Sequence, residues 1–411
     1  MKKTLAAVAV LGAFAGSALA ADVQLYGIVD TGVGYNHVDM DSLDGVTLDN
    51  DGKAVYSFAD SDSFSMMSGQ ASGSRWGLKG TEDLGNGLTV GFILEDGFTS
   101  DNGADSAPMF NRESSLFVQG GFGKFAMGRM GSLNNGQSSW AKVGMVSAFG
   151  TSDWGGYSAQ LSNIFSLAGQ WDNMVAYETP SFAGFKVYAQ YAMGSNDNEN
   201  ESSSDRYYAI GATYNNGPFA GYFAVDSINY HTSGLEFDDK YIDDSLTVTL
   251  GGSWNFEVAK VYFGAQYFDE VKLSSIGGIT KTTVSDVNLS KLDKLLPNIT
   301  VGALVKVKGY GISLTADAPV AGGKAMFGVG YVDAEAADSI QDALKDNNAD
   351  ADLDLKRYVV SVGYDYPFSK RTDVYAVASY MQDQVDAKLN GSSEDWDPSA
   401  YTLYVGLRHK F

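Results

Sequence analysis

The sequence predicts an all-β fold: a single transmembrane β-barrel of sixteen antiparallel strands, with short turns at one end and long loops at the other. Three observations predict it. The 411 residues include 48 glycines, 24 tyrosines and 22 phenylalanines, but only 7 prolines and no cysteine. The chain ends in a strand that alternates without a break, and short turns rich in Gly, Asn and Pro alternate with long polar segments. A barrel that buries only alternate residues in lipid has this pattern.

The closing strand is the clearest element. Residues 401–411 alternate between an apolar face that ends on Phe411 and a polar face with Arg408 and Lys410. Side chains in a strand point alternately to opposite sides. Eleven residues span about 36 Å, which at a ~45° tilt covers the roughly 25 Å apolar band of an outer-membrane barrel. We expect this strand to pair with the first one and to close the cylinder.

The N-terminus predicts export. Lys2 and Lys3 precede an apolar run over residues 5–16 and a small-residue cleavage site that ends at Ala20. This pattern is typical of a secretory signal peptide over residues 1–20. The mature chain, residues 21–411, is expected to be one barrel domain. No later stretch has the ~18 consecutive apolar residues of a spanning helix, and the absence of cysteine excludes a disulfide scaffold.

A repeating unit organises the rest of the chain. The first strand begins near Val23, and a strand, a tight turn, a second strand and a longer polar loop then recur. The short turns fall at 83–87, 120–123, 179–181, 215–218, 255–257, 318–322 and 367–369. Seven hairpins and two terminal strands give sixteen strands. A secreted β-sandwich or solenoid would alternate too, but a sandwich need not confine long loops to alternate connections. Residues 113–119 and 373–381 mix polar and apolar residues on both faces.

Charged residues on the strands indicate which face meets water. Arg75 and Lys79 alternate with Trp76 and Leu78 in the same strand. A lipid-facing Arg or Lys at mid-bilayer costs about 2–4 kcal/mol, whereas sixteen strands leave a water-filled lumen. We therefore expect both basic residues to face the lumen. Glu95 lies on the polar face of the next strand.

Three stretches together resemble the general diffusion porins of Gram-negative bacteria, most closely their β-proteobacterial and neisserial branch. They read V-Q-L-Y-G-I-V-D-T-G-V after the signal, S-R-W-G-L-K-G-T-E-D-L-G-N-G-L at 74–88, and L-F-V-Q-G-G-F-G-K-F-A-M-G-R at 116–129. The resemblance runs along the whole chain, including its aromatic end. It implies a passive outer-membrane channel for ions and small hydrophilic solutes. It also implies a homotrimer, and recognition of Phe411 by the barrel assembly machinery.

The resemblance also implies a constriction. The third long loop, at about residues 130–172, is expected to fold inward, so that acids on it face basic residues of the wall and filter solutes by size and charge. The basic candidates are Arg75, Lys79, Arg112 and Arg129; the acidic candidates are Glu95, Asp153 and Asp172. Strict alternation would place Arg129 with Met127, so its lumen assignment rests on the resemblance and on its place at a strand end. Because the loop lacks a P-E-F-G-G motif, the acid at the constriction stays open.

Charge narrows the range of partners. The formal net charge is −22, and acids gather in residues 38–62 and 333–354, which argues against nucleic acid. Such outer loops attract cations while the wall cluster is basic, so ion selectivity stays open. Besides the outer-membrane lipid, we expect contact with lipopolysaccharide. No cofactor, resident metal or enzymatic activity is expected, apart from weak divalent-cation binding at the acidic loops. The alternatives are a substrate-selective channel, or a barrel that also binds host or envelope partners through these loops.

Overall fold

The computed structural model describes residues 22–39, 44–48, 54–58, 60–105, 108–194, 204–230, 243–273, 306–346, 351–389 and 392–411. The expected signal peptide at residues 1–20 lies outside the described residues, as do parts of both acidic segments. Among the described residues, no helix is long and apolar enough to cross a membrane.

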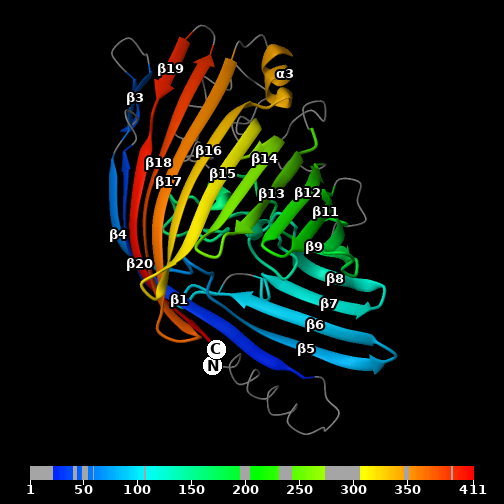
Figure 1. Cartoon of the computed structure of the whole chain (residues 1–411). Helices are drawn as coiled ribbons and strands as arrows, with labels where there is room; N and C mark the ends of the chain where they lie inside the picture. Colours follow the sequence, from blue (N-terminus) through cyan, green and yellow to red (C-terminus); the bar gives the residue numbers. More distant parts are fainter. Residues whose placement is uncertain are drawn as a thin grey trace.

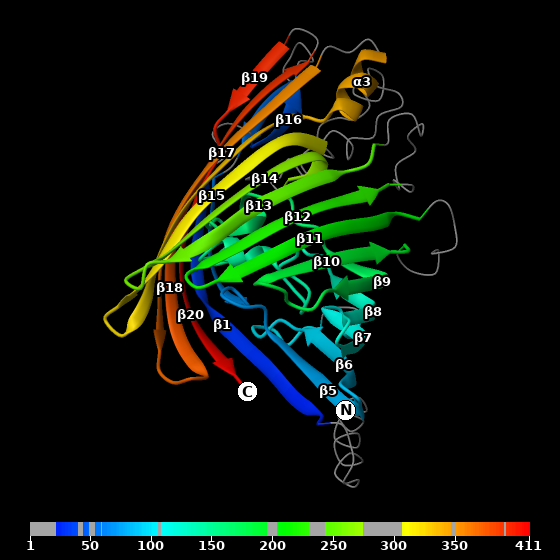
Figure 2. The ribbon, with the colours of Figure 1, turned by 45° about the vertical axis from the view of Figure 1, so that its right-hand side comes forward.

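The strands form one closed antiparallel sheet (Figures 1 and 2). Their bounds are β1 (Gln24–Asp39), β4 (Ser61–Ser68), β5 (Arg75–Gly85), β6 (Leu88–Gly97), β7 (Glu113–Gly120), β8 (Gly123–Gly131), β9 (Gln170–Glu178), β10 (Phe185–Ala192), β11 (Arg206–Asn216), β12 (Phe219–Asn229), β13 (Leu246–Asn255), β14 (Lys260–Lys272), β15 (Lys306–Val320), β16 (Gly323–Ala336), β17 (Ala351–Pro367), β18 (Thr372–Leu389), β19 (Ser392–Trp396) and β20 (Ser399–Lys410). A separate hairpin joins β2 (Asp44–Leu48) to β3 (Ala54–Phe58).

The wall has sixteen strand positions, which confirms the predicted fold class. Two positions hold two strands each: β4 and β5 pair with successive halves of β1, and β19 and β20 pair with successive parts of β18. Each of the seven predicted turns joins two neighbouring strands at the same end of the barrel. At the other end, a nine-residue helix, α3 (Asp338–Asp346), follows β16 (Figure 2).

The two faces of the wall differ in chemistry. On β20 the outward residues Leu403, Val405 and Leu407 are about half exposed, whereas Thr402 and Tyr404, which alternate with them, are buried. Outward apolar residues are expected where lipid replaces water. The buried apolar residues gather inside the barrel, between its wall and the loop that follows β8. This loop supplies the protein with a packed core inside the cylinder.

The last residue extends the seam that closes the cylinder. β20 pairs with β1 from Ile28, opposite Lys410, up to Asp39, opposite Ser399. Beyond the ladder, Phe411 exchanges two backbone hydrogen bonds with Gly27, of 3.0 and 3.1 Å. A Cβ atom at Gly27 would lie 2.3 Å from the Phe411 ring. Gly27 therefore makes room for the terminal aromatic ring against the first strand.

Candidate pore constriction

The loop between β8 and β9, residues 132–169, runs inside the barrel, as the resemblance implied (Figures 1 and 2). Its backbone is tied to wall side chains at successive points from β10 around to β20. These hydrogen bonds are Leu133 N to Gln190 Oε1 (2.9 Å), Ser166 N to Gln266 Oε1 (2.6 Å), Ala148 N to Thr315 Oγ1 (2.8 Å), Ala159 N to Ser361 Oγ (2.8 Å) and Thr402 Oγ1 to Gly155 O (3.0 Å). The loop therefore lines a large part of the wall and narrows the lumen.

Apolar side chains hold the loop where the wall carries glycines. Val146, Ile164 and Phe165 are each at most 1 % exposed. A Cβ atom at Gly311 would lie 2.0 Å from the carbonyl oxygen of Ile164, and one at Gly330 would lie 2.3 Å from its side chain. Close backbone approach is a reason for glycine inside a strand. These glycines let the loop lie directly on the wall.

A buried ion pair anchors the same part of the loop. Arg357 on β17 binds Asp383 on β18 through two hydrogen bonds of 2.7 Å, and both residues are at most 1 % exposed. Arg357 Nη1 also donates to the carbonyl oxygen of Asn163 in the loop, at 3.0 Å. Bidentate Arg–carboxylate pairs combine strength with fixed geometry. No motif in the sequence marks this pair.

At the wall formed by β5, β6 and the start of β7, two arginines share one carboxylate. Arg112 Nε lies 2.7 Å from Glu95 Oε1, and Arg75 Nε lies 3.5 Å from Glu95 Oε2. The hydroxyl of Tyr26 on β1 also donates to Glu95, at 3.0 Å. Arg112 Nη1 reaches the loop by donating to Gln137 Oε1, at 2.9 Å. Three of the predicted residues thus form one cluster of wall charges.

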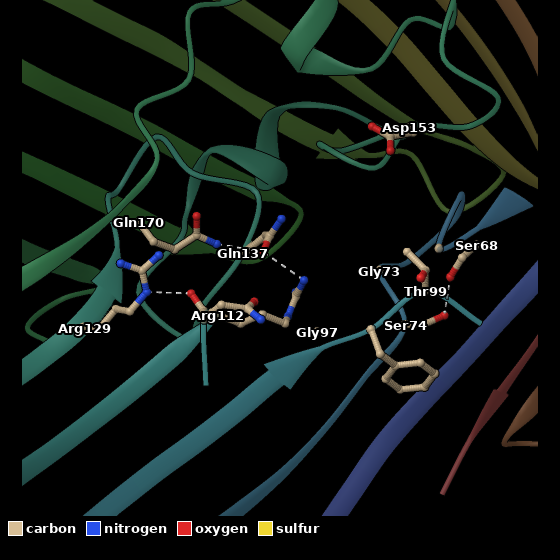
Figure 3. Close-up of a pocket in the computed structure, with 13 residues that line it drawn as sticks. Ser68, Gly73, Ser74, Gly97, Thr99, Arg112, Arg129, Gln137, Asp153 and Gln170 are labelled. Carbon is tan, nitrogen blue, oxygen red and sulfur yellow. Dashed lines mark hydrogen bonds between the residues drawn. The ribbon is translucent and has the colours of Figure 1, made fainter. Parts of the chain in front are cut away.

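Two hollows meet at this cluster. The outer hollow lies on the side of the long loops and includes Arg129. The inner hollow lies on the side of the short turns and includes Arg75, Lys79 and Glu95. Five residues line both: Gly69, Gly73, Arg112, Gln137 and Asp153. We call these five residues the waist. Figure 3 shows Asp153 on the loop, across the outer hollow from Arg112 and Arg129.

Asp153 differs from the other charged candidates. Its side chain is exposed to the lumen, and it forms no hydrogen bond or ion pair through its carboxylate with any described residue. Glu95, in contrast, is held by three neighbours. The free carboxylate of Asp153 and the paired arginines of the wall therefore present opposite charges on two sides of the opening.

The remaining candidates lie nearby but outside the waist. Arg129 lines the outer hollow and binds Asp172, with 2.6 Å between Nη1 and Oδ1. Strict alternation would place its side chain outside the barrel, with Met127. The ladder to β9 shifts register between Gly128 and Met130, however, and the Arg129 side chain lines the outer hollow. Asp172 is not among the lining residues of either hollow. Lys79 Nζ lies 4.9 Å from the ring centroid of Tyr26.

Two loop contacts at the site had no signal in the sequence. Gln137 accepts hydrogen bonds from both Arg112 and Gln170, at 2.9 and 2.7 Å. Glu113, only 1 % exposed, accepts hydrogen bonds from the Ser139 backbone and hydroxyl. Both contacts join a wall strand to an irregular Gly- and Ser-rich segment, where periodicity carries no information. Among the described residues, no cluster of His, Asp and Glu is arranged to hold a metal ion.

A closed barrel with a lipid-facing apolar exterior, a polar lumen and an inward loop defines a membrane channel. A family model described as Gram-negative porin matches residues 6–386. Full-length relatives are an outer-membrane porin protein of Bordetella pertussis, 33 % identical, and outer membrane porin protein 32 of Delftia acidovorans, 29 % identical; each alignment covers 100 % of both chains. The chain belongs to the Gram-negative porin family and is an outer-membrane channel.

Solved structures agree with this assignment. An anion-selective porin from Comamonas acidovorans is 25 % identical, with a TM-score of 0.63 and coverage of 95 % of this chain and 100 % of that one. The outer-membrane protein OmpT of Vibrio cholerae, folded in vitro, is 16 % identical with a TM-score of 0.52, covering 95 % and 97 %. The second likeness supports the fold alone.

Proposed function

We propose that the waist, together with Arg75 and Glu95, is the filter through which ions and small hydrophilic solutes diffuse passively. The observation that carries this proposal is the meeting of the two hollows at one ring of residues, where arginines of the wall face Asp153 of the loop. Charge at the narrowest point of a water-filled channel governs which ions pass. Size exclusion follows from the loop that fills the rest of the lumen.

A weak preference for anions follows from the charges of the described lining residues. The two hollows are lined by four basic residues, Arg75, Lys79, Arg112 and Arg129, and by three acidic ones, Glu95, Glu113 and Asp153. The anion-selective porin from Comamonas acidovorans is a structural relative, and its selectivity supports the same sign. The acidic outer loops act in the opposite direction and keep the preference weak.

Reversal potentials in planar bilayers test this filter. In a KCl gradient we expect a small anion preference for the native channel. Arg75→Glu should shift the preference toward cations, because it makes the charge beside the waist more negative by two units. Added sugars or amino acids should not block the current, since a general pore lacks a substrate site. Solute-dependent block would favour a substrate-selective channel, and an unchanged reversal potential in Arg75→Glu would contradict the filter.

The oligomeric state, the processing site and the binding of cations are proposed as follows. We propose a cofactor-free homotrimer embedded in outer-membrane lipid and lipopolysaccharide, which predicts conductance steps in multiples of three. The mature protein is proposed to start at Ala21 after removal of residues 1–20, which N-terminal sequencing tests. Divalent cations are proposed to bind only weakly at the acidic outer loops.

Deleting Phe411 should lower the amount of assembled barrel far more than it changes the conductance of barrels that form. The ring and the backbone of Phe411 lie on Gly27 at the seam, about 45 % exposed, and outside both hollows. We propose that this terminal strand is also recognised by the barrel assembly machinery. Phe411→Tyr is the matched control, because it keeps an aromatic terminus. Heat-shifted and unshifted bands on gels measure assembly; equal yields for the deletion and the control would contradict the proposal.

A further inference from the structure

Six residues leave the barrel wall beside β1. On that side, β5 pairs with β1 up to Ile28, opposite Arg75, and β4 resumes at Thr31, opposite Ser68. Only two residues of β1 therefore face the six residues 69–74, which we call the wall bend. Gly69 begins the bend at φ +73°. The bend protrudes into the lumen, since Gly69 and Gly73 line both hollows.

A buried carboxylate fixes the shape of the wall bend. Asp30 on β1 is fully buried and accepts hydrogen bonds from the backbone N–H groups of Ala71 and Ser72, at 3.0 and 2.7 Å. It also accepts one from the hydroxyl of Tyr375 on β18, at 2.5 Å. The Ser74 hydroxyl closes the other end by donating to the Asp30 carbonyl, at 3.0 Å. Charge-assisted hydrogen bonds of this kind are stronger than neutral ones.

The tip of the inward loop is fastened to the crest of the bend. Gln70 accepts from the backbone N–H of Trp154 through its carbonyl oxygen and from that of Gly155 through its side chain, both at 2.8 Å. The Trp154 ring packs edge-on against Phe149 and Tyr375, with centroids 5.9 and 5.3 Å apart. Gly155 has φ +89°, and a Cβ atom there would lie 2.0 Å from Thr402. The packing of the tip therefore leaves no room for a side chain at residue 155.

The wall bend adjoins charged residues on both sides of the opening, Asp153 through the loop tip and Arg75 through the chain itself. Asp153 directly precedes Trp154 and has no contact of its own that would hold its carboxylate. Arg75 directly follows the bend and donates from Nη1 to the carbonyl oxygen of Gly73, at 3.0 Å. We propose that the wall bend sets the width of the waist, and that Gln70 is the positioning residue that places Asp153 opposite the wall arginines. This inference rests on the proposed filter.

Gln70→Met tests the contact between Gln70 and the loop tip, which we call the clamp. The substitution keeps the volume of the side chain and removes the acceptor for the Gly155 N–H. We expect a single-channel conductance about 1.5-fold larger, since the tip then keeps only one bond to the wall bend, from Trp154 to the backbone of residue 70, and can move away from the narrowest point. The reversal potential should shift toward anions, as it does for Asp153→Asn, because both changes take a negative charge away from the waist. The Gln70→Met/Asp153→Asn double variant should show the ion preference of Asp153→Asn alone.

Gln266→Met is the matched control. Gln266 also binds loop backbone, at Ser166, but that segment is held in addition by Ile164 and Phe165 against wall glycines and lies outside the waist. We expect its conductance and reversal potential to match the native channel, with all variants still showing the heat-shifted band of a folded barrel.

The outcomes separate the clamp from the filter. A Gln70→Met channel with native conductance, or a Gln266→Met channel that widens equally, would overturn the clamp. If Asp153→Asn leaves the ion preference unchanged, the filter role of Asp153 is wrong. The conductance of Gln70→Met then tests whether the bend sets the width of the waist. A larger conductance supports that role, and a native conductance overturns it.

Discussion

Replacing Glu95 by Gln is expected to make the channel clearly anion-selective. Glu95 is the carboxylate that Arg75 and Arg112 share, at 3.5 and 2.7 Å. Without it, two guanidinium groups face the waist with no carboxylate between them. A unit charge ~7 Å from a passing ion contributes about 0.6 kcal/mol in bulk water and about 2.4 kcal/mol at an effective dielectric constant of ~20. We therefore expect the anion-to-cation permeability ratio to rise at least threefold, roughly, at low salt.

The measurement is the reversal potential at low and high ionic strength. Salt screens exposed charges, so the difference between Glu95→Gln and the native channel should shrink as the salt concentration rises. Glu257→Gln is the matched control: it makes the same chemical change at an exposed turn between β13 and β14, away from both hollows. A native ion preference in folded Glu95→Gln channels would show that this carboxylate does not act on passing ions.

The fold was largely predictable because the lipid imposes one rule on every strand. The seven short turns separate the strands, which gives the strand count. Because apolar residues lie on the outer face, the alternation in residues 401–411 predicts a closing strand. The lumen assignment of Arg75 and Lys79 followed from the same rule. No comparable rule describes the interior, where a residue meets either water or the loop.

This second environment explains the strands that looked ambiguous. In residues 373–381, Tyr375 and Val377 are apolar or aromatic and almost fully buried, although they face inward. They pack against the loop tip at Trp154 and Phe149. Phe117 in residues 113–119 is buried against the loop in the same way. Alternation fails there because the wall has a core on its inner face.

The sequence predicted which charged residues lie near the site, but not which residues they bind. Asp172 was a candidate for the constriction, yet its carboxylate is bound to Arg129 beside it. Gln70 and Gln137 carry no charge and lie in irregular segments, so no pattern marked them. Their contacts join residues 85 and 25 positions apart in the chain. Such contacts depend on how the loop is laid on the wall, which a single sequence does not specify.

Replacing Arg357 by Met is expected to destabilise the barrel and release the loop. Arg357 and Asp383 are buried, and removing one member of a buried ion pair typically costs about 3–5 kcal/mol, because the buried carboxylate loses the two hydrogen bonds of the arginine. The substitution also removes the donor to the Asn163 carbonyl of the loop. We expect unfolding at lower temperature or urea concentration, followed by the gel shift of the folded band, and noisier open-channel currents.

Two further variants distinguish the buried charge from the loop contact. Arg357→Met/Asp383→Asn should recover part of the lost stability, since residue 383 is then neutral and cheaper to bury, but should keep the current noise, because the bond to Asn163 is still absent. Arg408→Met is the matched control. Arg408 pairs with Asp365 and Asp373 near the short turns, at 3.2 and 3.0 Å, and is 14 % exposed. It touches no loop residue by hydrogen bond, so its loss should cost less stability and leave the noise unchanged. Quiet currents in Arg357→Met would show that wall glycines and apolar packing hold the loop without the arginine.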